Sequence, residues 1–148
     1  MKVYSFLNTV LLINGRQITG WADGDDVISA KRSVDSASHK IGADGAMVVS
    51  VSADRSGEFI FKLLKTSDSN AYLNGLINAQ ETFGAAGFTP VGVLMQDTFR
   101  QDRASGDTGY MKTQPAMTGG ATATTQEWTV VVERMDLVFG TTPDVLPS

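Results

Sequence analysis

The alternation of side chains in residues 58–64 constrains the fold more than any other feature of the sequence. Phe59, Phe61 and Leu63 fall on one face of an extended chain, while Glu58 and Lys62 fall on the other. This period of two is typical of a strand with one buried face. The chain is therefore predicted to be mainly β, with further strands at residues 3–13, 16–21, 47–52, 90–96, 109–117 and 127–139.

Two local signals predict how these strands are connected. Asn14-Gly15 separates two apolar runs, and this dipeptide favours a tight hairpin because both residues tolerate positive φ. One helix is predicted before residues 84–87, with Ser67 or Asp68 as its cap and a short apolar stripe on one side. The stripe consists of Leu73, Leu76, Ile77 and Gln80. We expect a two-sheet β-sandwich or barrel with this helix packed on one face.

The composition narrows the classes of function. The 148 residues match one domain, and the formal charge of −4 gives no overall attraction to nucleic acid or to an anionic membrane. Absence of cysteine excludes disulfides, zinc fingers and thiol nucleophiles. The N-terminal residues make a poor signal peptide, and the longest apolar run, residues 10–13, is far shorter than the ~20 residues that span a bilayer.

Candidate catalytic and metal-binding groups are sparse. The single histidine, His39, lies in a polar stretch and favours an exposed or interfacial position over a general base. The cluster Asp23-Gly24-Asp25-Asp26 lacks the further ligands of a calcium loop, so we interpret it as a solvated turn. Residues 41–45 have glycines but no phosphate-loop Lys, and they predict a hairpin turn. We expect no catalytic residue, no cofactor and no metal site.

Residues 27–41 form an unusually polar segment. Lys31, Arg32 and Lys40 stand against Asp35, a local charge of 3 − 1 = +2 with His39 neutral. Composition alone leaves a surface loop possible; the sharper hypothesis is a projecting β-hairpin whose basic tip reaches a second copy of the chain. The receiving side would be acidic, supplied by Asp23, Asp25 and Asp26, or by Asp97 and Asp102.

Several short motifs resemble the tail tube protein of contractile-tailed bacteriophages. The similarity lies within residues 4–135, with gaps, and does not extend to residues 96–107 or 143–148. Its most specific part is Ser52-Ala53-Asp54-Arg55-Ser56-Gly57, leading to Phe61-Lys62-Leu63-Leu64-Lys65-Thr66-Ser67 and Asn70-Ala71-Tyr72-Leu73. The other parts are Tyr4-Ser5-Phe6-Leu7-Asn8, Ile13-Asn14-Gly15, Ile41-Gly42-Ala43-Asp44-Gly45, Lys112-Thr113-Gln114-Pro115 and Glu127-Trp128.

The resemblance implies a single tail-tube domain over residues 1–148, with a projecting assembly hairpin at 27–41 and an extended C-terminal arm at 140–148. It also implies hexameric rings that stack into a hollow tube in the virion tail, assembled in the host bacterial cytoplasm. The implied partners are further copies, a tail sheath protein, a baseplate or tube initiator and a tape measure protein. Genomic DNA would pass through without specific binding, and no membrane is involved.

An acidic subunit suits such a conduit, since a basic lumen would retain phosphates. Small polar side chains are our candidates for the lumen surface: Ser50, Ser52, Thr113 and Thr129.

Three alternatives remain open on sequence grounds. The tube protein of a bacterial contractile injection or type VI secretion system would have the same chemistry. A small β-barrel ligand-binding module would need a pocket lined by aromatic side chains, whereas Phe59, Phe61 and Trp128 are more simply explained as core residues. A hydrolase would have only carboxylates and hydroxyls to work with, given one His and no Cys.

Overall fold

A computed structural model describes residues 1–122 and 124–145 of the chain. Within these residues, ten strands and one α-helix follow one another, preceded by a single 3₁₀ turn at Phe6–Asn8. The strands are β1 Thr9–Ile13, β2 Arg16–Gln17, β3 Ile28–Arg32, β4 Ala37–Ile41, β5 Met47–Val51, β6 Gly57–Leu64, β7 Val91–Asp97, β8 Arg103–Thr113, β9 Thr125–Val132 and β10 Asp136–Val138, and the helix is α1 Ser69–Phe83. No helix in the described part of the chain is long and apolar enough to cross a membrane.

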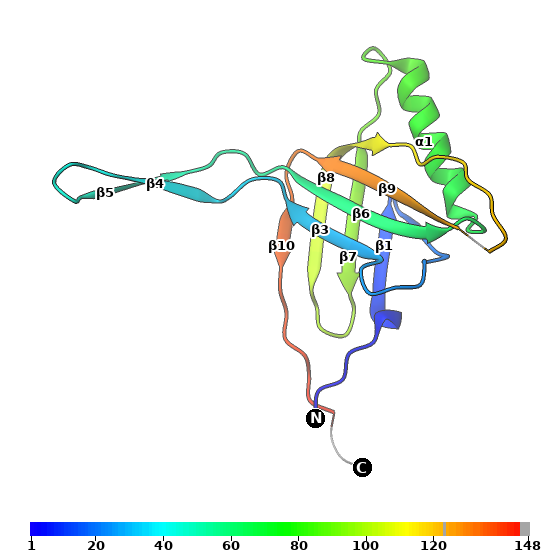
Figure 1. Cartoon of the computed structure of the whole chain (residues 1–148), viewed down its shortest axis with the longest axis horizontal. Coiled ribbons are helices and arrows are strands. Elements are labelled where there is room, and N and C mark those ends of the chain that lie inside the picture. The colour runs from blue at the N-terminus through cyan, green and yellow to red at the C-terminus, as the bar shows by residue number, and fades with distance from the viewer. Residues whose placement is uncertain (123, 146–148) are drawn as a thin grey trace.

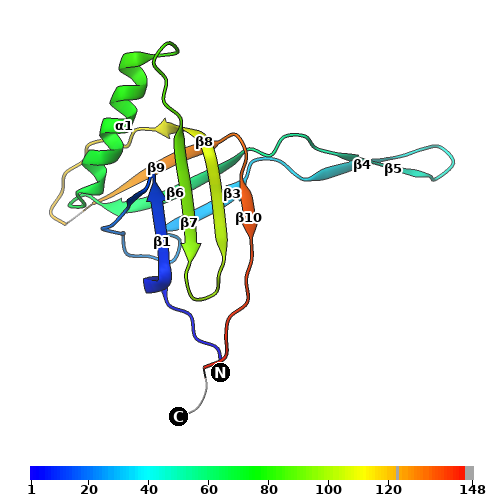
Figure 2. The same cartoon turned by 180° about the vertical axis from the view of Figure 1, so that it is seen from behind.

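Eight of the strands form one antiparallel sheet that folds over on itself (Figures 1 and 2). Its order is β2-β1-β7-β8-β9-β6-β3, and β10 pairs with the first part of β8. The long strand β8 belongs to both halves, because it pairs with β7 and β10 near its start and with β9 near its end. The predicted mainly β fold with one flanking helix is confirmed, but the two layers of the body are halves of one sheet and not the two separate sheets that were expected.

The core lies between the two halves of this sheet. Phe59, Phe61 and Leu63 of β6 are fully buried, as their alternation predicts. In the register of β6 with β9, Phe59 stands opposite Val130 and Phe61 opposite Trp128. Since residues directly opposite one another in a pair of strands point to the same side, these side chains form a continuous apolar layer.

Helix α1 covers one end of the core and completes the hydrogen bonding of β8. Leu73 and Ile77 are buried, and Gly84, with φ 55°, ends the helix as predicted. The Gln80 side-chain amide donates to the Met111 carbonyl (3.0 Å) and accepts from the Met111 amide (3.1 Å). These bonds satisfy a backbone pair beside the point where the register of β8 with β9 shifts.

The first hairpin forms at Asn14 and Gly15, whose φ angles are 51° and 82°. Its return strand is only Arg16–Gln17, shorter than the predicted 16–21. Gly20 has φ +80°, and a Cβ atom there would overlap the Ser67 side chain. At this point the chain leaves β1 and passes to β6, where Trp21 forms an isolated antiparallel bridge with Leu63.

Two other predicted boundaries were wrong. Strand β8 begins at Arg103, six residues before the predicted start at 109, where alternating Ala104 and Gly106 let it pack between β7 and β10. The expected strand at 127–139 is divided into β9 and β10, because the chain leaves β9 after Val132 and returns along the other part of β8.

The projecting hairpin also differs from the prediction. Residues 27–41 do not pair with each other: β3 pairs with β6 at the edge of the body, while β4 pairs only with β5. Ile28 and Ala30, two residues apart, pack on the core opposite Phe61 and Phe59. This packing stabilises β3 as a strand of the large sheet. The element that leaves the body in Figure 1 is therefore residues 33–56, which we call the projecting hairpin.

Candidate assembly surfaces

The projecting hairpin has one apolar face and one mixed face. In its register, His39 is opposite Val49, and Lys40 is opposite Val48. Paired residues share a side and neighbours alternate, so Lys40 and Val48 lie on the face opposite to His39 and Val49. The apolar face consists of Ala37, His39, Ile41, Met47, Val49 and Val51.

Among the described residues, none covers this apolar face. Val49 is 59% exposed and Val51 is 73% exposed, although β-branched aliphatic side chains are usually among the most buried. The two strands form a separate two-stranded sheet (Figure 1). Because an isolated two-stranded hairpin is marginally stable in water, the apolar face favours a partner that adds a third layer or strand.

Local hydrogen bonds give the projecting hairpin its shape. At the tip, the Gly42 amide donates to the Ala46 carbonyl at 2.7 Å, and the Ala46 amide donates to the Asp44 carboxylate at 3.1 Å. At the base, the Asp54 carboxylate accepts from the amide (2.9 Å) and the hydroxyl (2.7 Å) of Ser56. These bonds, with a smaller contribution from the charge of Arg32, hold the pKa of Asp54 below its usual value.

The predicted basic tip is wrong. Lys31 and Arg32 lie on β3 in the body, so the projecting hairpin keeps only Lys40 and Arg55 as cations. Against them stand Asp35, Asp44 and Asp54, a charge of 2 − 3 = −1 with His39 neutral. Contact of Lys31, Arg32, Asp35, His39 and Lys40 with a second copy stays a prediction, but attraction of a cationic tip to an acidic surface does not account for it.

The two acidic groups predicted to contact the hairpin of a second copy differ in exposure and in hydrogen bonding within their own chain. Asp23, Asp25 and Asp26 lie in the exposed turn before β3. Asp97 is 8% exposed, and its carboxylate accepts from the amides of Phe99 and Arg100, which fixes the turn after β7.

Asp102 is likewise engaged inside the chain. It accepts from the Arg100 guanidinium at 2.9 Å and from the Gly140 amide at 2.7 Å. These two bonds, Arg100 first, lower the pKa of Asp102. Since Arg100 also donates to the Thr142 hydroxyl at 2.6 Å, this cluster fastens the C-terminal segment to the β7–β8 turn.

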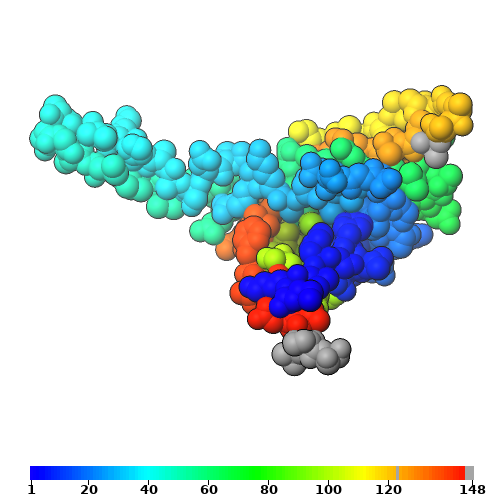
Figure 3. Space-filling model, turned by 60° about the horizontal axis from the view of Figure 1, so that its bottom comes forward, coloured from blue at the N-terminus to red at the C-terminus, as the bar shows by residue number. Residues whose placement is uncertain are grey.

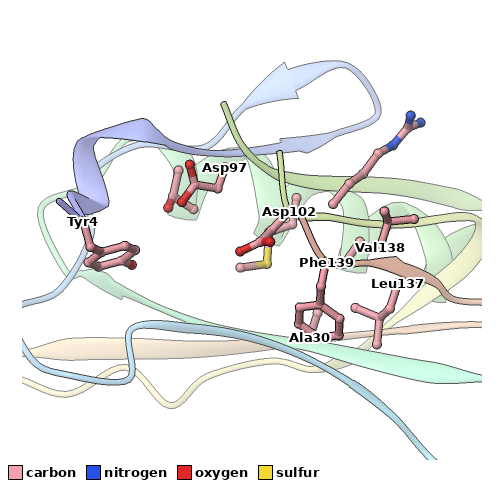
Figure 4. Close-up of a pocket in the computed structure, with 11 residues that line it drawn as sticks. Tyr4, Ala30, Asp97, Asp102, Leu137, Val138 and Phe139 are labelled. Carbon is pink, nitrogen blue, oxygen red and sulfur yellow. The ribbon is translucent and has the colours of Figure 1, made fainter. Parts of the chain in front are cut away.

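A groove opens where the two chain ends approach the edge of the sheet (Figure 3). It has a volume of about 190 Å³, and its lining is mostly apolar. Tyr4 lies at one end and Leu137 and Phe139 at the other, with the Asp97 carboxylate on the wall between (Figure 4). We call this the terminal groove and define it by Tyr4, Ala30, Met95, Leu137, Val138 and Phe139.

A second, acidic hollow adjoins the terminal groove. It has a volume of about 460 Å³ and shares Tyr4, Thr9 and Met95 with the first. Asp23 and Asp25 form its far wall. Members of both predicted acidic groups therefore line adjoining hollows: Asp97 and Asp102 the terminal groove, Asp23 and Asp25 the acidic one.

The chain termini are tied together beside the terminal groove. Lys2 and Asp144 form an isolated antiparallel bridge, and the Val145 amide donates to the Met1 carbonyl at 2.7 Å. Residues 146–148, the end of the predicted C-terminal arm, lie outside the described residues.

The four predicted lumen residues do not share a surface. Ser50 lies on β5 and Ser52 just beyond it, both on the projecting hairpin, whereas Thr113 and Thr129 are opposite one another on β8 and β9. Thr129 is only 8% exposed. A lumen-facing place for these four residues stays a prediction, and the near-complete burial of Thr129 in the single chain counts against its part of it.

No candidate catalytic centre is assembled by the described residues. His39 lies out on the projecting hairpin, away from the acidic clusters of the body. Within residues 1–122 and 124–145, no group of three or more His, Cys, Asp or Glu side chains is placed to hold a metal ion.

Comparison with known proteins adds a family and a set of similar folds. Residues 1–140 match the sequence model of the bacteriophage PhiTE tail tube protein family. The sequence matches none of the curated proteins.

Three solved structures have similar folds at 9–10% sequence identity. The anti-feeding prophage cap, a tube-terminating cap, has a TM-score of 0.67, with 95% of this chain and 93% of that chain covered. The sheath/tube terminator of the extracellular contractile injection system PVC has a TM-score of 0.63, with 93% and 98% covered. The sheath-tube complex of PVC has a TM-score of 0.57, with 88% of both chains covered.

Proposed function

The chain belongs to the bacteriophage PhiTE tail tube family, and from that membership we propose that it is the repeating structural subunit of a phage tail tube. The observation that carries the proposal is the uncovered apolar face of the projecting hairpin. Val49 and Val51 are more than half exposed in the single chain. This apolar surface is still exposed when the single chain is folded. Association with another copy buries it and therefore lowers the free energy.

The expected assembly is a hexameric ring, with rings stacked into a tube through which DNA passes. Contact between two different surfaces of identical chains generates a ring where the rotation closes and a helical stack where it does not. The projecting hairpin supplies one surface, and it is long enough to reach beyond its own subunit (Figure 1). The net charge of −4 keeps a conduit from retaining the phosphates of DNA.

Other partners follow from the same proposal. A sheath protein would surround the tube, and one similar fold comes from a sheath-tube complex. A baseplate or tube initiator would start assembly, and a tape measure protein would set its length. The virion tail is the expected location.

A second candidate is a terminal ring that closes the tube. Two of the similar folds are a tube-terminating cap and a sheath/tube terminator, and both have higher TM-scores than the sheath-tube complex. A terminator needs one stacking face instead of two. It would form rings that do not elongate at any protein concentration.

Light scattering over a concentration series, with negative-stain electron microscopy of the same samples, tests these proposals. Tubes support the repeating subunit, and single rings that never stack support the terminator. A compact monomer at every concentration, with and without a preformed baseplate as initiator, would contradict both and return attention to a ligand-binding module. Deleting residues 27–41 is unsuitable as a control because it removes β3 from the body.

A further inference from the structure

Exposed large apolar side chains gather at two places in the described chain. Of the seventeen that are more than about one-third exposed, six lie on the projecting hairpin and seven near the chain termini. The hairpin set is Val34, Ile41, Met47, Val48, Val49 and Val51, of which Val48 lies on the face opposite to Ile41, Met47, Val49 and Val51. The terminal set is Met1, Val3, Tyr4, Leu7, Val138, Phe139 and Val145. Only four others lie elsewhere, so these two patches hold most of the apolar surface that association could cover.

One copy cannot bring its own two patches together. The projecting hairpin points away from the body, while the termini lie below the body in Figure 1. Strands β4 and β5 pair with each other and with no other strand of the described part of the chain. A second copy is therefore the occupant that covers both patches at once, through a contact of two unlike surfaces.

The terminal groove has the size and lining to accept the hairpin face. An apolar cavity of about 150 Å³ admits a benzene-sized group, so the groove, at about 190 Å³, admits one or two aliphatic side chains. Ala30 on its wall belongs to β3, the edge strand of the sheet. An edge strand has unpaired backbone groups to which a strand of another chain can hydrogen-bond.

Charge decides which part of the opening receives the hairpin. The projecting hairpin carries a charge of −1, with Asp44 at its tip. The adjoining hollow presents Asp23 and Asp25 and would repel it. In the terminal groove, Asp97 and Asp102 are bonded within the chain, and the exposed Arg103 adds a cation to the lining.

We propose that the apolar face of the projecting hairpin of one copy lies in the terminal groove of the next copy. The inference rests on the proposed tube function and goes beyond it by naming the receiving surface. Val49 and Val51 enter between Tyr4 and Phe139, and the acidic adjoining hollow stays open to solvent.

Disulfide trapping tests this contact directly, because the natural chain has no cysteine to give a background. Full-length Val49→Cys chains are mixed with Val138→Cys chains under assembly conditions and oxidised. A disulfide needs Cβ atoms about 4 Å apart, so a covalent dimer in a denaturing gel reports a close contact. Phe139→Cys is the second groove variant if Val138→Cys folds poorly.

The matched control places the second cysteine at Ala79, which is exposed on helix α1. We expect several-fold more mixed dimer for Val49 with Val138 than for Val49 with Ala79. Equal yields, or dimers formed by Val49→Cys alone, would overturn the groove assignment while assembled rings in the micrographs left the tube function standing. Absence of assembly in every mixture and in the natural chain, with and without a preformed baseplate, would contradict the tube function, and the inference with it.

Discussion

Replacing Val49 and Val51 by serine should weaken self-association and leave the folded subunit intact. Complete burial of a valine side chain contributes about 1.5 kcal/mol. Only the part exposed in the single chain, 59% for Val49 and 73% for Val51, can still be buried on association. The two together are worth about 2 kcal/mol per contact, which corresponds to roughly 30-fold weaker association.

The matched control for this substitution is Val48→Ser. Val48 is 64% exposed, between the two test positions, but it lies with Lys40 on the opposite face of the projecting hairpin. Serine there removes the same atoms and changes strand propensity by the same amount. We expect less than about a twofold change in association, a difference near the limit of additivity for unrelated surface changes.

The assay is the concentration of half-association, measured by light scattering for the natural chain, Val48→Ser and the Val49→Ser, Val51→Ser pair. Thermal unfolding of unassembled chains should be the same for all three, because the projecting hairpin contributes nothing to the core. The reasoning fails if Val48→Ser weakens association as much as the pair. It also fails if the pair leaves association unchanged in chains that still assemble.

Two further predictions concern the body. Gln80→Met keeps the length of the side chain but loses both hydrogen bonds to the Met111 backbone. It should lower the free energy of unfolding, measured by urea titration, by about 1–3 kcal/mol. The control Glu81→Ala, at an exposed position of the same helix, should change the free energy of unfolding by less than about 0.5 kcal/mol. The lowered pKa of Asp102 means that its bonds stabilise the folded chain above the unfolded-state pKa of about 3.9 and are lost as pH falls through the lower folded-state pKa. The amide chemical shift of Gly140, followed by NMR, should therefore change with a midpoint below about pH 3.9 in the natural chain and show no such step in Asp102→Asn.

The body of the fold was predictable because its signals are local. Phe59, Phe61 and Leu63 alternate within one strand, and Leu73 and Ile77 recur within one helix, so the period alone assigns each element and its buried side. Asn14 and Gly15 likewise specify their turn without reference to the rest of the chain.

Strand partners were less predictable, because pairing depends on residues far apart in the chain. Ile28 and Ala30 are only two apolar residues among many polar ones, too few to indicate a strand by themselves. They become a strand because β6 places Phe61 and Phe59 opposite them. The pairing of residues 37–41 with 47–51 could have been predicted from a local feature. The turn at residues 42–45 joins these two segments directly, and short connections favour pairing of consecutive strands.

The apolar run at 47–51 shows why the candidate site was only partly predictable. Hydrophobic residues in a sequence indicate that a surface will be buried, but they do not indicate which chain will bury it. In this protein Phe61 is buried by its own chain, whereas Val49 and Val51 remain exposed after folding is complete. To tell these two cases apart, one must know that β4 pairs with β5, because this pairing places residues 47–51 outside the body. Because the hairpin face contributes to no core within the subunit, substitutions there change association without changing folding, and that separation is what makes the valine and cysteine experiments decisive.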